Sequence, residues 1–493
     1  MQESRYSLRS LALIVLALVL VGAVPAATST SIVRLESERS LGDGRLAALL
    51  ASPDDAIATR AALAIGRTKL EAGVPLLEGH LTDRRDAVRA MSVYGLGLIG
   101  LGNGATAILR ALKADPSGAV QVAAIDALGR YEEGKHLYAR LEGPVAVALL
   151  TALDSTTRLT PDVRGKAAIA LGFFARTPYV DAIVPQLLTA FAREHDPGVR
   201  ERIMWTIFRY YATDVPISAL RRGLADADEI VRIEAVRAYG KRKDAALVAD
   251  LKPLLNDPSW RVQEQAAESI RVLQGGKMTE HWTAIPAYVH TPAPQPDAFA
   301  SLPAFARTAP PRGGPRAYDV PPSPALLPQT ARDMLGPAHG PHPRLRIVTT
   351  QGNIYVALYP EWAPLTVTNF LNLMNRGFLD NNPWFRIVPD FVVQTGEQDA
   401  KNAPGPGYTI PAEENPLEQN SYVISMGLNY DDKTSTPIRD SAGSEYYITL
   451  SPQYHLDNAF TVFGAVTSGF DVLGRLTESD EVLRVERVAD VTL

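Results

Sequence analysis

The strongest constraint on how this chain folds is an internal repeat in its N-terminal half. An apolar residue, then Arg or Gln, then an alanine-rich stretch recurs at intervals of about 30 to 40 residues, which suits one pair of short helices per copy. The Arg or Gln of the copies is Arg60, Arg89, Gln121, Arg164, Arg200, Arg232 and Gln263. One helix pair cannot bury its apolar face alone, so the copies must stack. The sequence therefore predicts an all-α solenoid over residues 28–275.

Three copies begin with an Asp-Pro pair, in which Asp offers a capping oxygen and Pro has no N–H to leave unpaired in the first helical turn. These pairs start at Asp115, Asp196 and Asp257. The array as a whole resembles HEAT repeats. We expect the recurring Arg or Gln to form a ladder of hydrogen bonds between stacked copies; the alternative is that it faces a ligand. Solenoids of this kind present a curved surface that commonly holds another protein, but the sequence does not identify that partner.

A proline-rich connector follows at residues 276–343. Proline lacks the N–H that helices and central strands need, so this stretch is expected to be extended and mostly exposed. It separates the solenoid from a second domain. His339 and His342 lie close together in the connector, but they have no acidic or thiol companion nearby in the sequence, so no metal site is predicted.

From Arg344 the apolar pattern changes to that of β-strands. Apolar residues alternate over 345–349 and again over 354–358, with a Gln-Gly-Asn turn between them, which predicts a hairpin. An amphipathic helix is expected to begin near Ala363-Pro364 and to end at Gly377. Two strands and a helix thus open the C-terminal domain.

Ordered motifs run through this domain. They are Leu358-Tyr359-Pro360, the run from Trp384 to Gly396, the run from Gly405 to Glu413, the run from Gly443 to Thr449, His455-Leu456-Asp457 and the run from Thr461 to Gly464. In this order they resemble the motifs of cyclophilins, over less than a third of the chain. The resemblance implies a closed eight-stranded β-barrel with flanking helices over residues 344–493. It also implies peptidyl-prolyl cis/trans isomerase activity on proline-containing polypeptides, with no cofactor and no metal.

Position by position, the resemblance implies a catalytic set of Arg386, Phe391 and Gln394. The substrate-binding set that it implies is Phe385, Val392, Gly427, Leu428, Glu445, Tyr447, His455, Leu456 and Phe460. Isomerisation makes no lasting covalent change, so the site only has to weaken amide resonance behind a barrier of about 18–20 kcal/mol. A guanidinium, which is always charged, can donate a hydrogen bond to the prolyl nitrogen in the twisted state while an aromatic floor holds the proline ring.

Three residues of these sets depart from what is common among cyclophilins. Phe385 stands where many members have His, Glu445 replaces a frequent Gln, and Phe460 replaces a His of many eukaryotic members. The segment 427–442 is also longer than usual. These departures bear on substrate preference and turnover more than on the fold.

The first 27 residues have the pattern of an export signal. Arg5 and Arg9 precede an apolar run over residues 11–24, which is followed by small residues. The run is too short to cross a bilayer comfortably, so we expect a secretory signal peptide, residues 1–27, cleaved near Ala26. The alternative is an uncleaved anchor that tethers the same domains outside the cytoplasmic membrane. Both imply a periplasmic or other extracytoplasmic location.

The chain contains no cysteine and has a net charge of −5. It can form no disulfide or thiolate metal site, and its charge gives no reason to expect nucleic acid as a partner. The sequence thus predicts an exported prolyl isomerase that assists protein folding, with the repeats recruiting a protein partner or client. Two alternatives stay open. One is a non-catalytic scaffold or chaperone that only binds proline-containing segments, and the other is a protein whose main function lies in its repeats.

Overall fold

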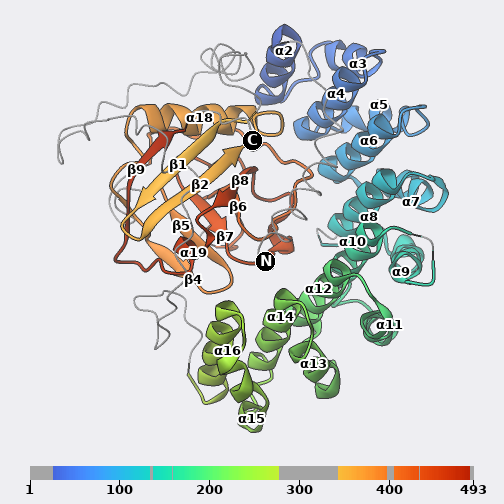
Figure 1. Ribbon diagram of the computed structural model, residues 1–493. Helices are drawn as coiled ribbons and strands as arrows, with labels where there is room; N and C mark the ends of the chain where they lie inside the picture. Colours follow the sequence, from blue (N-terminus) through green and yellow to red (C-terminus); the bar gives the residue numbers. More distant parts are fainter. Residues whose placement is uncertain are drawn as a thin grey trace. The chain divides into compact units, whose positions relative to one another are not determined.

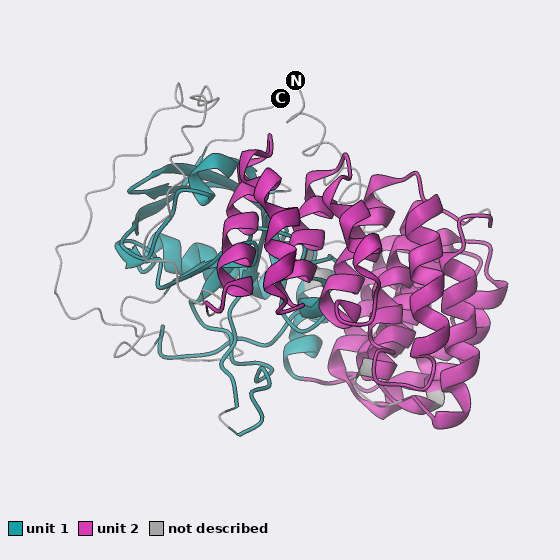
Figure 2. Cartoon of the chain, turned by 90° about the horizontal axis from the view of Figure 1, so that it is seen from below, with its two compact units in different colours: residues 1–38, 279–493 teal, residues 39–278 magenta. Residues whose placement is uncertain are grey.

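The computed structural model describes residues 26–133, 137–157, 159–276, 342–396, 405–431 and 433–488. Two compact units make up the chain, one of residues 39–278 and the other of residues 1–38 together with 279–493 (Figure 2). Most of the predicted signal segment 1–27 and of the predicted connector 276–343 lies outside the described residues. No helix in the described ranges is long and apolar enough to cross a membrane.

The helical unit is built from pairs of short helices (Figure 1). Its helices are α3 (Arg45–Leu50), α4 (Asp55–Thr68), α5 (Val74–Glu78), α6 (Asp86–Ile99), α7 (Ala105–Ala114), α8 (Gly118–Glu133), α9 (Ala139–Leu153), α10 (Pro161–Gly172), α11 (Val180–Arg193), α12 (Pro197–Thr206), α13 (Ile217–Leu224), α14 (Glu229–Gly240), α15 (Val248–Leu251) and α16 (Trp260–Leu273). The even-numbered helices from α4 to α16 pack on one another in succession, and each odd-numbered helix packs on the even-numbered helix that follows it. The predicted helical solenoid is thus confirmed, as two layers of helices.

Small residues let the even-numbered helices approach one another closely. Gly66 of α4 lies against Gly95 of α6, and a Cβ on Gly66 would stand 2.5 Å from the Gly95 Cα. Ala61 and Ala62 on the same helix are fully buried. The alanine-rich stretches of the repeat therefore serve to bring neighbouring helix backbones together, which is what a continuous stacked core requires.

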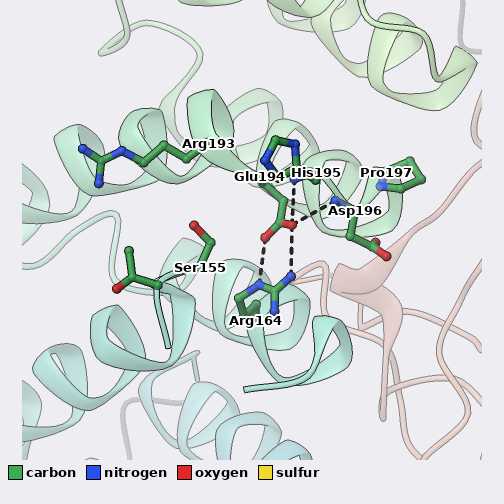
Figure 3. A pocket seen from close by; sticks show the side chains of 8 residues that line it. Ser155, Arg164, Arg193, Glu194, His195, Asp196 and Pro197 are labelled. Carbon is green, nitrogen blue, oxygen red and sulfur yellow. Dashed lines mark hydrogen bonds and ion pairs between the residues drawn. The ribbon is translucent and has the colours of Figure 1, made fainter. Parts of the chain in front are cut away.

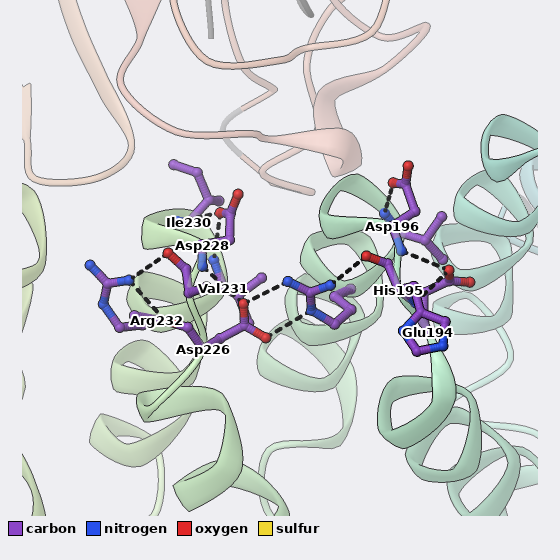
Figure 4. A network of polar contacts seen from close by, with 11 residues as sticks. Glu194, His195, Asp196, Asp226, Asp228, Ile230, Val231 and Arg232 are labelled. Atoms are coloured by element: carbon purple, nitrogen blue, oxygen red, sulfur yellow. Dashed lines mark hydrogen bonds and ion pairs between the residues drawn. The ribbon is translucent and has the colours of Figure 1, made fainter. Parts of the chain in front are cut away.

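An ion-pair ladder joins successive repeats. Arg200 donates from Nε and Nη2 to the two carboxylate oxygens of Asp226, at 2.8 and 2.9 Å, and from Nη1 to the His195 carbonyl at 2.9 Å. Its acceptors Asp226 and His195 are labelled in Figure 4. The same two-pronged pairing recurs in Arg89–Asp115, Arg164–Glu194 and Arg232–Asp257. The predicted ladder is confirmed at these four arginines.

Only one of the three Asp-Pro pairs starts a helix as predicted. Asp196 is the N-cap of α12, where its Oδ1 accepts from Val199 N at 3.1 Å and Pro197 is the first helical residue. The prediction was wrong for Asp115 and Asp257, which lie ahead of the first residues of α8 and α16. Their carboxylates are held by the ladder arginines of the preceding repeat. Each carboxylate also accepts from the backbone amide two residues on, Ser117 N at 2.9 Å and Ser259 N at 2.8 Å, so it holds the turn ahead of the helix and not the first turn of the helix.

The second unit contains one antiparallel sheet (Figure 1). Its helices and strands are α2 (Ala26–Ser37), β1 (Arg344–Thr349), β2 (Gly352–Leu358), α18 (Pro364–Asn375), β3 (Asn382–Pro383), β4 (Arg386–Val388), β5 (Val392–Thr395), β6 (Val423–Met426), β7 (Tyr446–Thr449), β8 (Val462–Ser468), α19 (Phe470–Leu473) and β9 (Glu481–Arg487). The strand order is β3-β9-β1-β2-β8-β6-β7-β5-β4. The predicted hairpin is confirmed as β1 and β2, with its turn at Thr350-Gln351, and the predicted helix is confirmed as α18.

The prediction of a closed eight-stranded barrel was wrong, because the sheet is a nine-stranded curled half-barrel. Its edge strands β3 and β4 pair with β9 and β5, and no ladder joins these two edges to each other in the described sheet. Only Trp384 and Phe385 separate the edge strands in sequence, so the sheet must curl to bring its edges near each other. A strand of two residues leaves too few backbone groups to close it.

A buried carboxylate from another part of the sheet unit caps α18. Glu413, which is 2% exposed, accepts from Leu365 N at 3.1 Å and from Thr366 N and Oγ1 at 2.8 Å. The first N–H groups of a helix have no partner within it, and the helix dipole favours a negative charge there. At the same end of α18, Leu365 forms a small buried apolar cluster with Val33 of α2. This end of the helix is therefore fixed by contacts that are distant in sequence.

Candidate active site

Strand pairing brings three of the predicted residues onto one face of the sheet. Arg386 on β4 stands opposite Gln394 on β5, and Gln394 stands opposite Tyr447 on β7. Residues directly opposite each other in an antiparallel pair put their side chains on the same face. The Arg386 Nη1 donates to the Gln394 Oε1 at 3.0 Å. The strand register thus aligns the guanidinium with the amide.

Glu445 orients the side chain of Gln394. The Gln394 Nε2 donates to Glu445 Oε1, while the Gln394 Oε1 accepts from Arg386. Glu445 passes close over Gly427, where a Cβ would stand 2.6 Å from the Glu445 Oε1, so a side chain at this position would require the carboxylate to move. A carboxylate only accepts hydrogen bonds, so it fixes which end of the amide faces Arg386. The three side chains form a continuous acid–amide–guanidinium chain.

Phe391 lies at the turn between β4 and β5, beside the guanidinium. The Arg386 Cζ stands 5.3 Å from the centre of the Phe391 ring, within the range of a cation–π contact. The His455 ring stacks on the same Phe391 ring, with centroids 6.0 Å apart and planes inclined by 16°. The Phe391 carbonyl accepts from Leu450 N at 2.8 Å, which holds the turn against the neighbouring segment. The Phe391 ring therefore contacts both a cation and an imidazole.

An apolar core lies behind these groups. Phe391 is partly buried and packs against this core. The predicted apolar residues that belong to the core are Val392, Leu428, Tyr447, Leu456 and Phe460. The Tyr447 and Phe460 rings meet edge-on, with centroids 5.9 Å apart. Burial raises the pKa of Tyr447 well above its ordinary value, so its phenol stays neutral.

Comparisons with known proteins bear on the same region. The sequence profile described as "Cyclophilin type peptidyl-prolyl cis-trans isomerase/CLD" matches residues 344–492, and the profile of HEAT repeats matches residues 42–129 and 214–280. Peptidyl-prolyl cis-trans isomerase B of Bacillus subtilis is 38% identical over 130 residues, which are 26% of this chain and 85% of that protein. The chain belongs to the cyclophilin-type peptidyl-prolyl cis-trans isomerases. Its C-terminal sheet unit is the cyclophilin domain, and its helical unit carries the HEAT repeats.

Other relatives match a similar length. A peptidyl-prolyl cis-trans isomerase of Synechococcus elongatus is 33% identical over 144 residues, 29% of this chain and 94% of that protein. One of Helicobacter pylori is 33% identical over 138 residues, 27% of this chain and 80% of that protein. A crystal structure of a Cryptosporidium parvum cyclophilin-type isomerase in the presence of the dipeptide Ala-Pro matches at 21% identity and a TM-score of 0.27, covering 30% of this chain and 99% of that one.

Two predicted residues of the cyclophilin domain are placed differently from the rest. Phe385 is half-buried in the link between β3 and β4, and no hydrogen bond or ring contact in the described part of the domain joins it to Arg386 or Phe391. The Gly427 amide donates to the Glu445 carbonyl at 2.8 Å. That N–H is therefore occupied by the domain itself.

Sequence reasoning missed one residue beside the cyclophilin site. Tyr430 lies in the long segment 427–442, and its ring centre is 6.5 Å from that of Phe460. Burial raises the pKa of Tyr430, while the charge of Arg386 lowers it and that of Glu445 raises it, so both charges act on the phenol. The sequence feature that could have indicated Tyr430 is the unusual length of this segment. The extra residues lie next to the site and match no residue of the cyclophilin motifs.

His342 has an acidic neighbour that its sequence surroundings did not show. Its Nδ1 lies 3.9 Å from the Glu361 Oε1 and 3.3 Å from the Leu358 carbonyl oxygen. Burial raises the pKa of Glu361 to about 7 and lowers that of His342. Within the described ranges, no three or more His, Asp or Glu side chains gather as metal ligands would, and His339 lies outside those ranges.

A hollow also lies in the HEAT repeats, where the sequence predicted no site. It has a volume of about 640 Å³ and is lined by Ser155, Thr156, Arg164, Arg193, Glu194, His195, Asp196 and Pro197 (Figure 3). Two of its charged groups belong to the ladder, where Arg164 binds Glu194 at 2.8 and 3.0 Å, and Asp196 caps α12. The lining is thus largely structural, and we assign it no chemistry.

Proposed function

We propose that this chain is an exported prolyl isomerase that assists protein folding, in which Arg386, Phe391 and Gln394 act on proline-containing polypeptides. One observation carries the assignment of the site. The Arg386 guanidinium is held 5.3 Å from the centre of the Phe391 ring and 3.0 Å from the Gln394 amide oxygen, so a cation and an apolar surface are fixed side by side.

In this proposal the proline ring of the substrate packs on Phe391. The proline ring is bounded by the core against which Phe391 packs, which includes Leu456 and Phe460. Seating the ring leaves the carbonyl of the preceding residue to rotate. The Gln394 Nε2 has a second N–H besides the one that it gives to Glu445, and this N–H can hold a substrate carbonyl.

Arg386 then acts on the prolyl nitrogen. The barrier of about 18–20 kcal/mol comes from amide resonance, which is lost as the bond twists and the nitrogen lone pair localises. One of the five guanidinium N–H donors goes to Gln394, which leaves others to donate to that lone pair. Because this hydrogen bond forms mainly in the twisted state, it raises turnover rather than affinity.

The assignment is tested by exchange NMR on a blocked peptide with one Ala-Pro bond, using the whole mature chain. We expect Arg386→Ala to lower kcat/KM by about 10²- to 10³-fold, the loss typical of removing one preorganised donor. Phe391→Ala should mainly raise KM, because it removes the surface that seats the ring. A matched control is Arg475→Ala, since Arg475 is bound to Asp471 on α19 and contacts none of the site residues. Equal rates for the wild type and both site variants would contradict the assignment.

We also propose that the HEAT repeats recruit a protein partner or client. Solenoids present extended surfaces for other proteins, and a second point of attachment raises the effective concentration of the isomerase at its substrate. The relatives consist almost wholly of the matched domain, so a chain lacking residues 39–275, which keeps α2 and its contact with α18, is a sensible comparison. It should isomerise a short peptide at the wild-type rate and accelerate the refolding of a client less well. Equal acceleration of every client tried would count against recruitment.

Export rests on the pattern of residues 1–27. Fractionation of cells that carry a C-terminally tagged chain, with and without these residues, is the direct test. The intact chain should be found outside the cytoplasm with a new N-terminus near Ala26, or at its full length if the segment is an uncleaved anchor. Retention of the intact chain in the cytoplasm would refute export.

A further inference from the structure

In the segment 427–442, which lies between β6 and β7, the described residues form a hairpin held by its own hydrogen bonds. Two backbone bonds of 2.7 and 2.9 Å join its arms, and Tyr430 stands opposite Pro437 between them. At the tip, the Asp431 carboxylate accepts from two backbone amides at 3.0 and 2.8 Å, which also lowers the pKa of Asp431. The hairpin therefore has a defined shape before any substrate arrives.

The base of the hairpin is fastened to the domain. Arg439 donates from Nε and Nη2 to the two oxygens of Glu414, at 2.6 and 3.0 Å, and the Glu414 side chain is 3% exposed. The next residue, Asp440, accepts from Ala412 N at 2.7 Å. A paired arginine and a buried carboxylate hold this position firmly, because separating them would leave a buried charge without its partner. The orientation of the hairpin is thus set by the domain core.

The hairpin presents an aromatic side chain beside the proposed site. Tyr430 is 53% exposed although its ring lies 6.5 Å from Phe460. Opposite residues of an antiparallel pair share a face, so Pro437 lies on the same face as Tyr430, while the next residue, Ile438, belongs to the other face. Tyr430 and Pro437 together form an apolar surface that continues from the core residues of the site.

The charges near Tyr430 favour an uncharged occupant for this surface. Arg386 and Glu445 both act on the Tyr430 phenol, and they are joined to each other through Gln394. These two opposite charges offset each other at the phenol, so they give a charged side chain no net attraction there. An apolar or aromatic side chain gains contact with a ring, which is typically worth a few-fold in affinity.

We propose that Tyr430 and Pro437 form a subsite for a large apolar or aromatic side chain that flanks the isomerised proline. The proposal deepens the function proposed above and rests on its assignment of the substrate to Arg386 and Phe391. It names a class of polypeptide, in which proline is preceded or followed by a residue such as Phe or Leu. Phe460 is one of the residues that bound the proline ring in that assignment, and Tyr430 is the exposed ring next to it.

Two series of blocked peptides test the subsite on the whole mature chain. The residue before the proline is varied in one series and the residue after it in the other, as Phe, Leu, Ala or Glu. In one of the two series, we expect kcat/KM for Phe to exceed that for Ala by about five-fold, the effect of one aromatic contact. Tyr430→Ala should abolish this preference and leave the Ala peptide unchanged. Tyr430→Phe should keep it, and so should the matched control Ile438→Ala.

Equal rates for Phe and Ala peptides in the wild type, or a preference that survives in Tyr430→Ala, would overturn the subsite. The same peptides are also titrated by NMR against Arg386→Ala with and without Tyr430→Ala. If the wild type turned over no peptide, the roles proposed for Arg386 would fail. The dissociation constants would then still test the subsite. If the subsite exists, Arg386→Ala binds Phe peptides more tightly than Ala peptides, and the double variant with Tyr430→Ala binds both equally.

Discussion

The HEAT repeats and the cyclophilin domain both bury charged side chains, but they pair them over different distances along the chain. In the repeats, Arg232 reaches Asp257, 25 residues away, and Arg164 reaches Glu194, 30 residues away. In the cyclophilin domain, Glu413 caps a helix 47 residues away, and Arg346 binds Glu486 at a separation of 140 residues. The repeats couple neighbours, whereas the domain couples segments that only the complete sheet brings together.

This difference concerns how far the effect of a mutation spreads. The stability of a solenoid is approximately a sum of the stabilities of its repeats and of the contacts between neighbours. A destabilising mutation therefore affects mainly its own repeat and the adjacent ones. A sheet whose contacts are long-range forms or melts as one cooperative unit. Three substitutions test whether the two regions of this chain behave in these two ways.

The largest effect is expected from Glu413→Ala in the cyclophilin domain. The substitution leaves two buried amides of α18 and the Thr366 hydroxyl without their acceptor, which should cost about 3–5 kcal/mol. Urea unfolding followed by hydrogen exchange should show the whole sheet losing protection together, while the repeats keep theirs. Glu413→Gln, which keeps an acceptor but loses the charge, is the matched control and should cost less. Loss of protection confined to α18 would show that the sheet does not unfold as one cooperative unit.

A smaller and local effect is expected from Arg232→Ala in the repeats. Arg232 binds Asp257 through two hydrogen bonds of 2.8 Å, and the Asp257 side chain is 5% exposed. Its removal leaves this carboxylate without the arginine at a cost of about 2–3 kcal/mol. Faster hydrogen exchange should be limited to α14, α16 and the segment between them. Arg222→Ala is the control, because Arg222 is exposed on α13. Cooperative unfolding of the entire array would show that its repeats are not independent.

The smallest effect is expected from pH, and it has opposite signs in the two regions. For Glu194 in the repeats, burial acts to raise the pKa, but hydrogen bonds from Arg164 and from backbone amides outweigh it and lower the pKa. Such a group adds stability that is present above its unfolded pKa and is lost as the pH falls. For Glu361 in the cyclophilin domain, burial raises the pKa from 4.5 to about 7. That group adds stability which is present below pH 4.5 and is lost as the pH rises through about 7.

We therefore expect Glu361→Gln to stabilise the cyclophilin domain at pH 8 by about 1–2 kcal/mol and to change little at pH 4.5. Thermal unfolding at the two pH values, resolved by hydrogen exchange into the two regions, measures this. The lowered pKa of His342 reduces the stability of the domain as the pH falls below neutral. This effect is the same in the wild type and in Glu361→Gln, so it cancels when their stabilities are compared. An equal gain at both pH values would show that the carboxylate does not ionise in the folded domain.

The same contrast explains how much the sequence could predict. The ladder was predictable because Arg89, Arg164, Arg200 and Arg232 recur at intervals that suit one pair of helices per stacked repeat. The pairing of Arg386 with Gln394 also follows from a local feature, the short β4–β5 hairpin. A short sequence period or a short loop between strands is enough to predict the local structure.

Contacts without a period could not be foreseen. Nothing near Glu413 in the sequence indicates that it caps α18, and nothing near Arg439 indicates that it fastens the long hairpin to Glu414. The shortness of β3, which leaves the sheet open, depends on its pairing with β9 from the far end of the chain. Tyr430 was missed for a related reason, since an insertion has no counterpart from which its place could be inferred.

The ladder also bears on how such a chain can change length. Each arginine lies on one side of a boundary between repeats and its carboxylate on the other. The separation is 30 residues for Arg164–Glu194, but 26 for Arg200–Asp226 and 25 for Arg232–Asp257. Excision of residues 201–232 would therefore leave Arg200 25 residues from Asp257, which is the separation that Arg232 has now. Recombination can add or drop whole modules and still regenerate a matched junction, so the number of modules is open to evolutionary adjustment without redesign of the interface.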